Sequence, residues 1–156
     1  GALGHGLPVA VGLALAAKKS NSSRRIFLIT GDGELAEGSN WEAALAAAHY
    51  GLDNLIIIND KNNLQLAGPT REIMNTDPLA DKWKAFGMTV TECQGNDMAS
   101  VVATLEGLKQ EGKPNVVIAN TTKGAGISFI QGRPEWHHRV PKGEEIALAL
   151  EELKDE

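Results

Sequence analysis

The sequence contains a single cysteine, Cys93, among its 156 residues. One cysteine cannot form a disulfide within the chain, and so few cysteines are typical of proteins from reducing compartments. No apolar run approaches the roughly 20 residues that a membrane-spanning helix needs. The sequence also shows no signal-peptide pattern. We therefore expect a cytoplasmic protein that does not enter membranes.

Positively charged residues are also fewer than negatively charged ones. The chain has 15 Lys and Arg against 20 Asp and Glu, which gives a formal net charge of −5. The resulting field does not favour binding to nucleic acid or to an anionic membrane surface. An anionic ligand such as a diphosphate would need a metal ion or a helix N-terminus to offset this charge.

The arrangement of apolar segments predicts an α/β fold. Continuous apolar runs at 26–29, 55–58 and 115–119 are typical of parallel strands buried on both faces. Between and around these runs we expect a shorter strand at 88–92, an irregular loop at 64–74, and helices at 7–17, 41–50, 77–86, 98–109 and 144–154. This alternation predicts one domain, residues 1–156, with three αβα layers and a mostly parallel sheet.

Three helix starts carry capping signals. Ser39 and Glu42 have the spacing of a capping box, with Ser39 as the N-cap. Asp77 followed by Pro78 is typical of an N-cap and a first-turn proline. Asp97 is the expected N-cap of the helix that begins at residue 98.

Two polar side chains follow consecutive strands of the predicted sheet. Asp32 stands between Gly31 and Gly33 after the first strand, and Asn62 follows the second strand 30 positions later. The carboxyl ends of neighbouring parallel strands lie side by side, in the crevice where such sheets bind ligands. Carboxylate and carboxamide oxygens are hard ligands that suit Mg²⁺ or Ca²⁺. The spacing therefore predicts a metal–diphosphate site.

Two further positions fit this site. The turn after Asn62 could direct the Leu64 carbonyl to the same metal, and a side chain at Gly33 would crowd a diphosphate lying on the turn. Taken singly, Asp32 and Asn62 are equally ordinary turn residues. The prediction of a ligand site depends on the pair.

At these positions the chain resembles thiamine diphosphate-dependent enzymes, which share the Gly-Asp-Gly…Asn pattern. Surrounding segments are similar to transketolases in particular, and the resemblance extends over nearly the whole chain. It matches the diphosphate-binding half, and most of all the N-terminal subunits of split bacterial transketolases. The segments that carry it are 31–38, 41–44, 48–55, 64–70, 78–87, 122–128 and 135–137.

The resemblance implies a thiamine diphosphate-binding fold and a role for each matching residue. Asp32, Asn62 and the Leu64 carbonyl would hold Mg²⁺ (or Ca²⁺), and Gly33 would contact the diphosphate of thiamine diphosphate. These assignments agree with the site predicted from spacing alone.

Other positions gain roles only through the resemblance. Gly1 and Leu3 would line the cofactor, with Leu3 near the aminopyrimidine. His137 would touch the diphosphate and face the substrate channel, which makes it the candidate catalytic residue. Glu37 and Glu42 match acidic residues at the family's subunit interface.

The remaining three histidines are not expected to be catalytic. His5 stands where the family more often has glutamine, His138 replaces a frequent glycine, and His49 lies in an Ala-rich helix. The family's other active-site histidines lie upstream of the position matching Gly1, and the glutamate that activates the aminopyrimidine belongs to another domain. Since the chain starts without methionine inside a glycine-rich motif, we expect a piece of a longer protein, truncated at its N-terminus.

The function implied by the resemblance is transfer of a two-carbon ketol unit from a ketose phosphate to an aldose phosphate, as in the pentose phosphate pathway. The partner would be a pyrimidine-binding domain or a C-terminal transketolase subunit, in a homo- or hetero-oligomer. The isolated chain is expected to be inactive. Two alternatives stay open: part of a 2-oxoacid dehydrogenase or deoxyxylulose phosphate synthase, and a non-catalytic assembly module.

Overall fold

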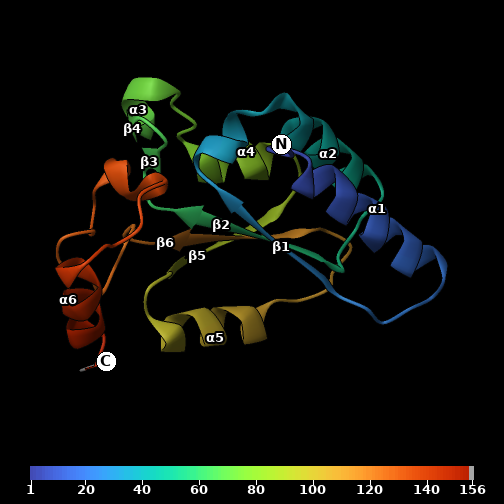
Figure 1. The fold of residues 1–156 in the computed structure, drawn as a ribbon. Coiled ribbons are helices and arrows are strands. Elements are labelled where there is room, and N and C mark those ends of the chain that lie inside the picture. Colours follow the sequence, from blue (N-terminus) through green and yellow to red (C-terminus); the bar gives the residue numbers. More distant parts are fainter. Residues whose placement is uncertain (155–156) are drawn as a thin grey trace.

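The computed structural model describes residues 1–154 (Figure 1). Its elements, in chain order, are α1 (Gly6–Lys19), β1 (Ile26–Gly31), the 3₁₀ helix η1 (Gly33–Ala36), α2 (Gly38–His49), β2 (Leu55–Lys61), β3 (Leu64–Gln65), β4 (Gly68–Pro69), α3 (Thr70–Ile73), α4 (Leu79–Ala85), β5 (Thr89–Gln94), α5 (Met98–Gly107), β6 (Asn115–Asn120), the 3₁₀ helix η2 (Pro134–His137) and α6 (Glu144–Glu152).

Four parallel strands form the central sheet in the order β1-β2-β6-β5. Each strand pairs in register with its neighbour, so that Gly31 lies beside Asp60, and Asp60 beside Ala119. All four carboxyl ends therefore meet at one edge of the sheet. The predicted three-layer α/β fold with a parallel sheet is confirmed.

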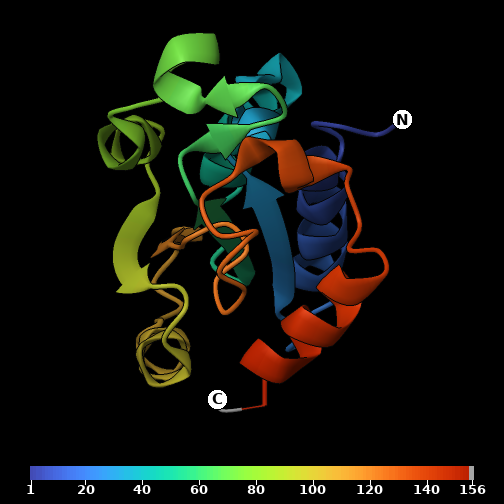
Figure 2. The same ribbon diagram turned by 60° about the vertical axis from the view of Figure 1, so that its left-hand side comes forward.

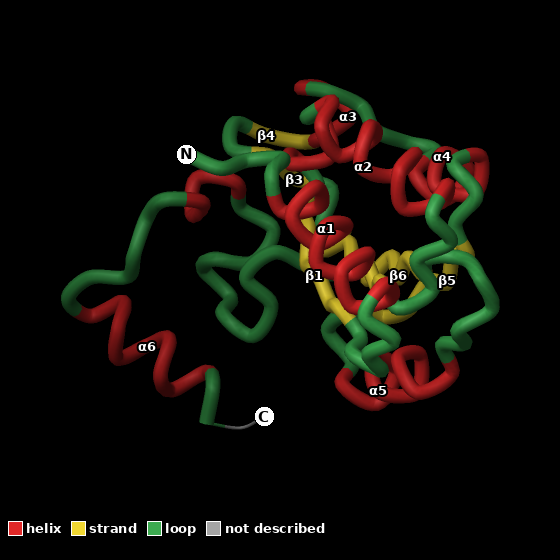
Figure 3. The backbone as a smooth tube through the Cα atoms, turned by 90° about the vertical axis from the view of Figure 1, so that its right-hand side faces the viewer, coloured by secondary structure: helices red, strands yellow, loops and turns green. Residues whose placement is uncertain are grey.

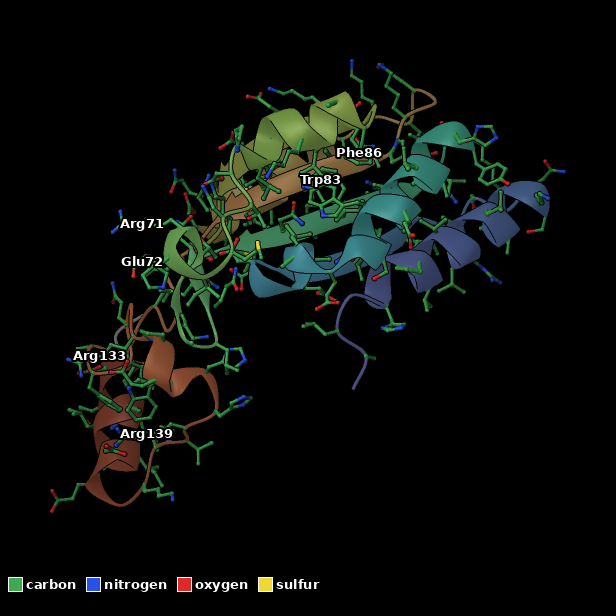
Figure 4. All side chains as sticks on the ribbon, turned by 90° about the horizontal axis from the view of Figure 1, so that it is seen from above. Arg71, Glu72, Trp83, Phe86, Arg133 and Arg139 are labelled. Carbon is green, nitrogen blue, oxygen red and sulfur yellow. The ribbon has the colours of Figure 1, made fainter. Side chains whose placement is uncertain are left out.

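One face of the sheet carries the main core. Helices α1, α2 and α4 cover it (Figure 1). Small residues such as Ala14, Ala44 and Ala47 let α1 and α2 approach each other closely over Ile57. Trp41 joins Trp83 and Phe86 in an aromatic cluster, with ring centroids 4.9 and 5.3 Å away. Trp83 and Phe86 are labelled in Figure 4.

The opposite face is only partly covered. Helix α5 packs on Ile56, Cys93, Val117 and Ala119, which belong to β2, β5 and β6. β1 was predicted to be buried on both faces, and this is wrong: on the α5 side Phe27 is 50% and Ile29 is 69% exposed. The apolar run predicted the strand correctly, but its burial depends on what covers the sheet, and among the described residues α5 does not reach β1.

Two predicted caps are also wrong, for tertiary reasons. Helix α2 begins at Gly38, and the Ser39 hydroxyl instead donates a hydrogen bond to the Gly4 carbonyl. Helix α4 begins at Leu79, and the Asp77 carboxylate pairs with Lys61. The Asp97 cap is confirmed, since its carboxylate accepts from the backbone N–H of Ala99 at 2.9 Å.

Two regions lie outside the αβα layers. Residues 64–74, predicted to be an irregular loop, contain the short antiparallel hairpin of β3 and β4 and then α3. The C-terminal segment with η2 and α6 stands beside the sheet and away from α1 (Figure 3). Helix α6 is tied to residue 128, where the backbone N–H and hydroxyl of Ser128 both donate to Glu152 at 2.6 Å. Within residues 1–154, none of the helices has the length and apolar character required to cross a membrane.

Candidate functional site

Asp32 lies where β1 ends and η1 begins. Its side chain is almost completely buried, with 3% of the residue exposed. One carboxylate oxygen, Oδ2, accepts a hydrogen bond from the backbone N–H of Asn63, just beyond β2. The contact joins the carboxyl ends of two adjacent strands. The structure therefore brings Asp32 and the Asn62–Asn63 turn together, as a parallel sheet requires.

The Asn62 side chain is held by two contacts. Its Oδ1 accepts from the backbone N–H of Leu64 at 2.9 Å, which closes a local turn. Its Nδ2 lies 3.4 Å from Oδ1 of Asp60, to which it donates. Asn63 has a φ of 61°, a left-handed conformation that asparagine tolerates. This turn brings the backbone of Asn62 and Asn63 against the Asp32 carboxylate.

The electrostatics around Asp32 favour a cation. Burial raises the pKa of its carboxyl group, and nearby Asp60 raises it further. The backbone N–H groups of Asn63 and Asn62, and the charge of Lys61, act in the opposite direction without cancelling the effect. Lys61 is itself paired with Asp77 at 2.9 Å. A metal ion at Asp32 would supply the missing positive charge.

The donor chemistry suits a hard cation better than zinc. Among residues 1–154, no cluster of three or more His, Cys, Asp or Glu is placed to hold a metal. The ligands predicted at this edge of the sheet are the Asp32 carboxylate, the Asn62 carboxamide and the Leu64 main-chain carbonyl, and the Asp60 carboxylate lies beside Asn62. Mg²⁺ often takes few protein ligands and completes its octahedron with phosphate oxygens and water. Asp32, Asn62 and Leu64 therefore fit Mg²⁺ carrying a diphosphate.

Gly33 lies next to the side chain of Gln65, a residue that the sequence analysis did not identify as part of the site. A Cβ atom built at Gly33 would lie 3.5 Å from Cγ of Gln65, an ordinary contact. Gln65 is anchored in turn, because its Nε2 donates to the Met74 carbonyl at 3.1 Å. The protein alone thus leaves room for a side chain at Gly33. That a diphosphate would be crowded there stays a prediction.

The glycine-rich loop lies against the same turn. Glu34 accepts a hydrogen bond from the Gly4 N–H at 3.1 Å, and the Gly4 carbonyl receives the Ser39 hydroxyl at 2.6 Å. Gly4 has a φ of +78°, and a Cβ there would come within 2.5 Å of Cβ of Glu37. Only glycine fits this position. Glu34 was not singled out from the sequence, although it directly follows the Gly-Asp-Gly turn.

The two loop residues expected to line the cofactor are exposed. Leu3 is 60% exposed, and a Cβ built at Gly1 would have no neighbour within 4 Å. A groove of about 430 Å³ opens next to this loop, between α1 and β1. Its lining includes His5 and Glu34 together with apolar residues of both elements. The loop is therefore fixed at Gly4 and open towards Gly1.

His137 ends η2, in the segment that Figure 2 shows in front of the sheet and beside the β3–β4 hairpin. Its ring is exposed and meets the ring of His138 edge-on, with centroids 4.6 Å apart. Partial desolvation lowers its pKa, and the charges of Lys123 and His138 add to this effect. The η2 segment lies beside the β3–β4 hairpin (Figure 2), and among residues 1–154 no hydrogen bond joins His137 to Asp32, so the role of His137 stays a prediction.

The remaining positions matched to the family lie on the surface. Glu37 is the residue before α2, and Glu42 lies on the exposed side of this helix. Neither side chain caps the helix. Both are accessible to a partner, and their interface role stays a prediction.

Comparison with known proteins places this arrangement in a family. The transketolase thiamine diphosphate-binding domain matches residues 1–154. An apulose-4-phosphate transketolase subunit from Actinobacillus succinogenes is 77% identical over 156 residues, which are all of this chain and 56% of that protein. A 6-deoxy-6-sulfo-D-fructose transketolase subunit from a Clostridium species is 41% identical over 100% of this chain and 57% of its own length.

Solved structures agree with these relatives. The crystal structure of transketolase from Campylobacter jejuni aligns with a TM-score of 0.89 at 34% identity, covering 97% of this chain and 25% of that one. Transketolase from Leishmania mexicana aligns with a TM-score of 0.74 at 27% identity, covering 99% and 28%. The chain spans a little over half the length of the two bacterial subunits that it matches. The sequence match, the shared fold and the Asp32–Asn62 arrangement lead to one conclusion: the chain belongs to the transketolase thiamine diphosphate-binding domain family.

Proposed function

We propose that this chain supplies the metal–diphosphate anchor of a transketolase that moves a two-carbon ketol unit between sugar phosphates. The observation that carries the proposal is the buried Asp32 carboxylate, held by the Asn63 N–H beside Asn62. A buried carboxylate without a cationic partner in hydrogen-bond contact is costly unless a metal compensates it. Family membership then identifies the diphosphate as that of thiamine diphosphate.

In this scheme the residues of this chain bind and orient the metal ion, the cofactor and the substrate. Asp32, Asn62 and the Leu64 carbonyl would hold Mg²⁺, and the turn at Gly33 would lie against the diphosphate. Leu3 and Gly1 would border the cofactor on the open side of the glycine-rich loop. His137 would donate or accept a hydrogen bond at the diphosphate or the substrate. Thiamine diphosphate, once bound, supplies the nucleophilic carbon and electron sink for ketol transfer.

The substrate belongs to the same proposal. The relative at 77% identity is named for apulose 4-phosphate, so this ketose phosphate is the first donor to test here. Xylulose 5-phosphate, the donor expected for the pentose phosphate pathway, is the second. The relative from Clostridium is named for 6-deoxy-6-sulfo-D-fructose, which extends the donor class to a sulfonated ketose.

A partner is proposed as well. Both relatives are named as transketolase subunits, which supports a hetero-oligomer whose second subunit carries the pyrimidine-binding domain. Exposed Glu37 and Glu42 are available for that interface. We further propose that residues 1–156 form one thiamine diphosphate-binding unit and that the assembly works in the cytoplasm.

The test uses the full-length protein assembled with its partner subunit, Mg²⁺ and thiamine diphosphate. We expect glycolaldehyde transfer from a ketose phosphate to an aldose phosphate, and none from 2-oxoacids. Asp32→Ala should reduce transfer at least about 100-fold, in line with loss of a metal ligand and its charge. Asp81→Ala, at an exposed position of α4, is the matched control and should retain full activity.

Two results would contradict the proposal. Turnover of 2-oxoacids without ketol transfer would assign the chain to a different reaction. Full activity of Asp32→Ala would remove the metal site. The 156-residue chain alone should show no transfer, and measurable turnover without a partner would overturn the proposed assembly.

A further inference from the structure

A second carboxylate lies next to the proposed metal ligands without being one of them. Asp60 is the penultimate residue of β2 and lies between Gly31 of β1 and Ala119 of β6. Its Oδ1 accepts two hydrogen bonds, one from the Thr121 hydroxyl and one from Nδ2 of Asn62. Asp60 thus links the end of β6 to the Asn62 turn.

These contacts determine which way the Asn62 amide faces. A carboxamide has one accepting oxygen and one donating nitrogen, and rotation by half a turn exchanges them. In the structure the nitrogen faces the Asp60 carboxylate and the oxygen faces the N–H of Leu64. The flipped amide would set its oxygen against a carboxylate and its NH₂ against an N–H donor, so both contacts would become repulsive.

The oxygen that Asn62 directs to the turn keeps a second lone pair for a cation. A flipped amide would present an NH₂ group, which cannot ligate a metal. Correct orientation is therefore a condition for Asn62 to act as a ligand at all. The Leu64 N–H favours this orientation at 2.9 Å, and the Asp60 carboxylate, 3.4 Å from the amide nitrogen, would favour it as well through its negative charge.

Asp60 is itself held from the neighbouring strand. The backbone N–H of Thr121 donates to the Lys61 carbonyl at 3.0 Å, which fixes Thr121 beside β2. Its hydroxyl then donates to Asp60. Lys61, the nearest cation along the chain, is paired with Asp77 and does not neutralise Asp60 by direct contact.

We propose that Asp60, held by Thr121, is a positioning residue that orients the Asn62 carboxamide for metal binding. This inference rests on the proposed function, because it assigns to Asn62 the role of a ligand. Partners of this kind behind a ligand typically change metal affinity about 10–100-fold when they are removed.

A double-mutant cycle in the full-length assembly tests the proposal. Binding of thiamine diphosphate in saturating Mg²⁺ is measured by calorimetry for wild type, Asp60→Ala, Asn62→Ala and the double variant. We expect Asp60→Ala to weaken binding about 10–100-fold in the wild-type background, but less than about threefold once Asn62 is alanine. Thr121→Val should weaken binding about three- to tenfold, since it acts through Asp60.

A further measurement and a substitute variant distinguish a loss of folding from a loss of positioning. Thermal unfolding of each cofactor-free variant shows whether the protein is intact. If Asp60→Ala does not fold, Asp60→Asn replaces it in the cycle, because the amide keeps the size of Asp60 but loses its charge and its preference for a donor. Asp60→Asn is then expected to weaken binding in the wild-type background and not in the Asn62→Ala background.

The possible outcomes distinguish failure of the Asp60 role from failure of the proposed function. Equal losses in both backgrounds, or no loss in either, would overturn the role of Asp60 even if Asp32→Ala abolishes binding. Absence of Mg²⁺-dependent binding in wild type would overturn the proposed function, and the inference with it.

Discussion

The two sides of the candidate site are held very differently. On one side, Asp32 is buried, joined to the Asn63 backbone and placed at the end of β1. On the other, His137 is exposed and its ring meets a side chain of its own segment, His138. The proposed metal side, formed by Asp32 and the Asn62–Asn63 turn, is therefore held by the ends of β1 and β2. The histidine side depends on a segment that stands beside the αβα layers (Figures 2 and 3).

This difference suggests that the two sides have different roles, metal binding on one and contact with substrate on the other. A metal site needs ligands fixed to a fraction of an ångström, which rigid strand ends provide. A residue that meets substrate can lie on a segment whose final position is set when cofactor and partner are present. We expect substitutions on the metal side to affect stability and cofactor binding, and substitutions on the histidine side to act locally.

The largest of these effects is expected in the glycine-rich loop. Gly4→Ala would place a Cβ 2.5 Å from Cβ of Glu37 in a left-handed backbone conformation. We predict a loss of about 2–4 kcal/mol in the free energy of unfolding, from backbone strain and steric overlap together. Gly1→Ala, with no neighbour within 4 Å, is the control and should be neutral. Urea denaturation of the cofactor-free protein measures both, and equal stabilities would show that the loop is not fixed at Gly4.

A smaller, local effect is expected on the histidine side. Trp136 is buried, meets Phe129 at a centroid distance of 5.3 Å, and carries the Arg139 guanidinium 4.1 Å from its ring. Trp136→Ala should release η2 and speed amide exchange around His137 about tenfold, with little change in the protection of β1 and β2. Hydrogen exchange read by mass spectrometry distinguishes the regions. Loss of protection throughout the sheet would mean that this segment is part of the core after all.

The smallest effect concerns the pKa of His137. Desolvation lowers it, and so does the Lys123 cation, because positive charge disfavours the imidazolium form. Lys123→Gln should therefore raise the pKa of His137 towards its ordinary value. An NMR titration of the imidazole checks this, with Lys19→Gln at the end of α1 as control. A pKa that is unchanged in Lys123→Gln would show that the two groups do not interact.

The proximity of Asp32 to the Asn62–Asn63 turn could be predicted from the sequence, because it follows from sheet geometry. Apolar runs before Asp32 and Asn62 indicate neighbouring parallel strands, and such strands bring their carboxyl ends together. Glu34 and Gln65 could not be found this way. Glu34 contacts Gly4, 30 positions away, and Gln65 contacts Met74, nine positions away, and neither contact has a local sequence pattern.

The wrong predictions have a similar cause, namely tertiary contacts that no local sequence pattern shows. Ser39 and Asp77 carry correct local capping signals, but Gly4 and Lys61 offer them tertiary partners instead. The exposure of Ile29 reflects what covers the sheet rather than the composition of β1. Local propensity predicted the elements, while the competition between partners determined their ends.

The central claim is that Asp32 anchors a diphosphate through a metal ion. The most direct measurement is calorimetric titration of thiamine diphosphate into the full-length assembly, with Mg²⁺ and after its removal by EDTA, for wild type and Asp32→Asn. We predict that metal removal and Asp32→Asn each weaken binding at least about 100-fold, and that together they do little more than either alone. Wild-type affinity and undiminished Mg²⁺ dependence in Asp32→Asn would contradict the account.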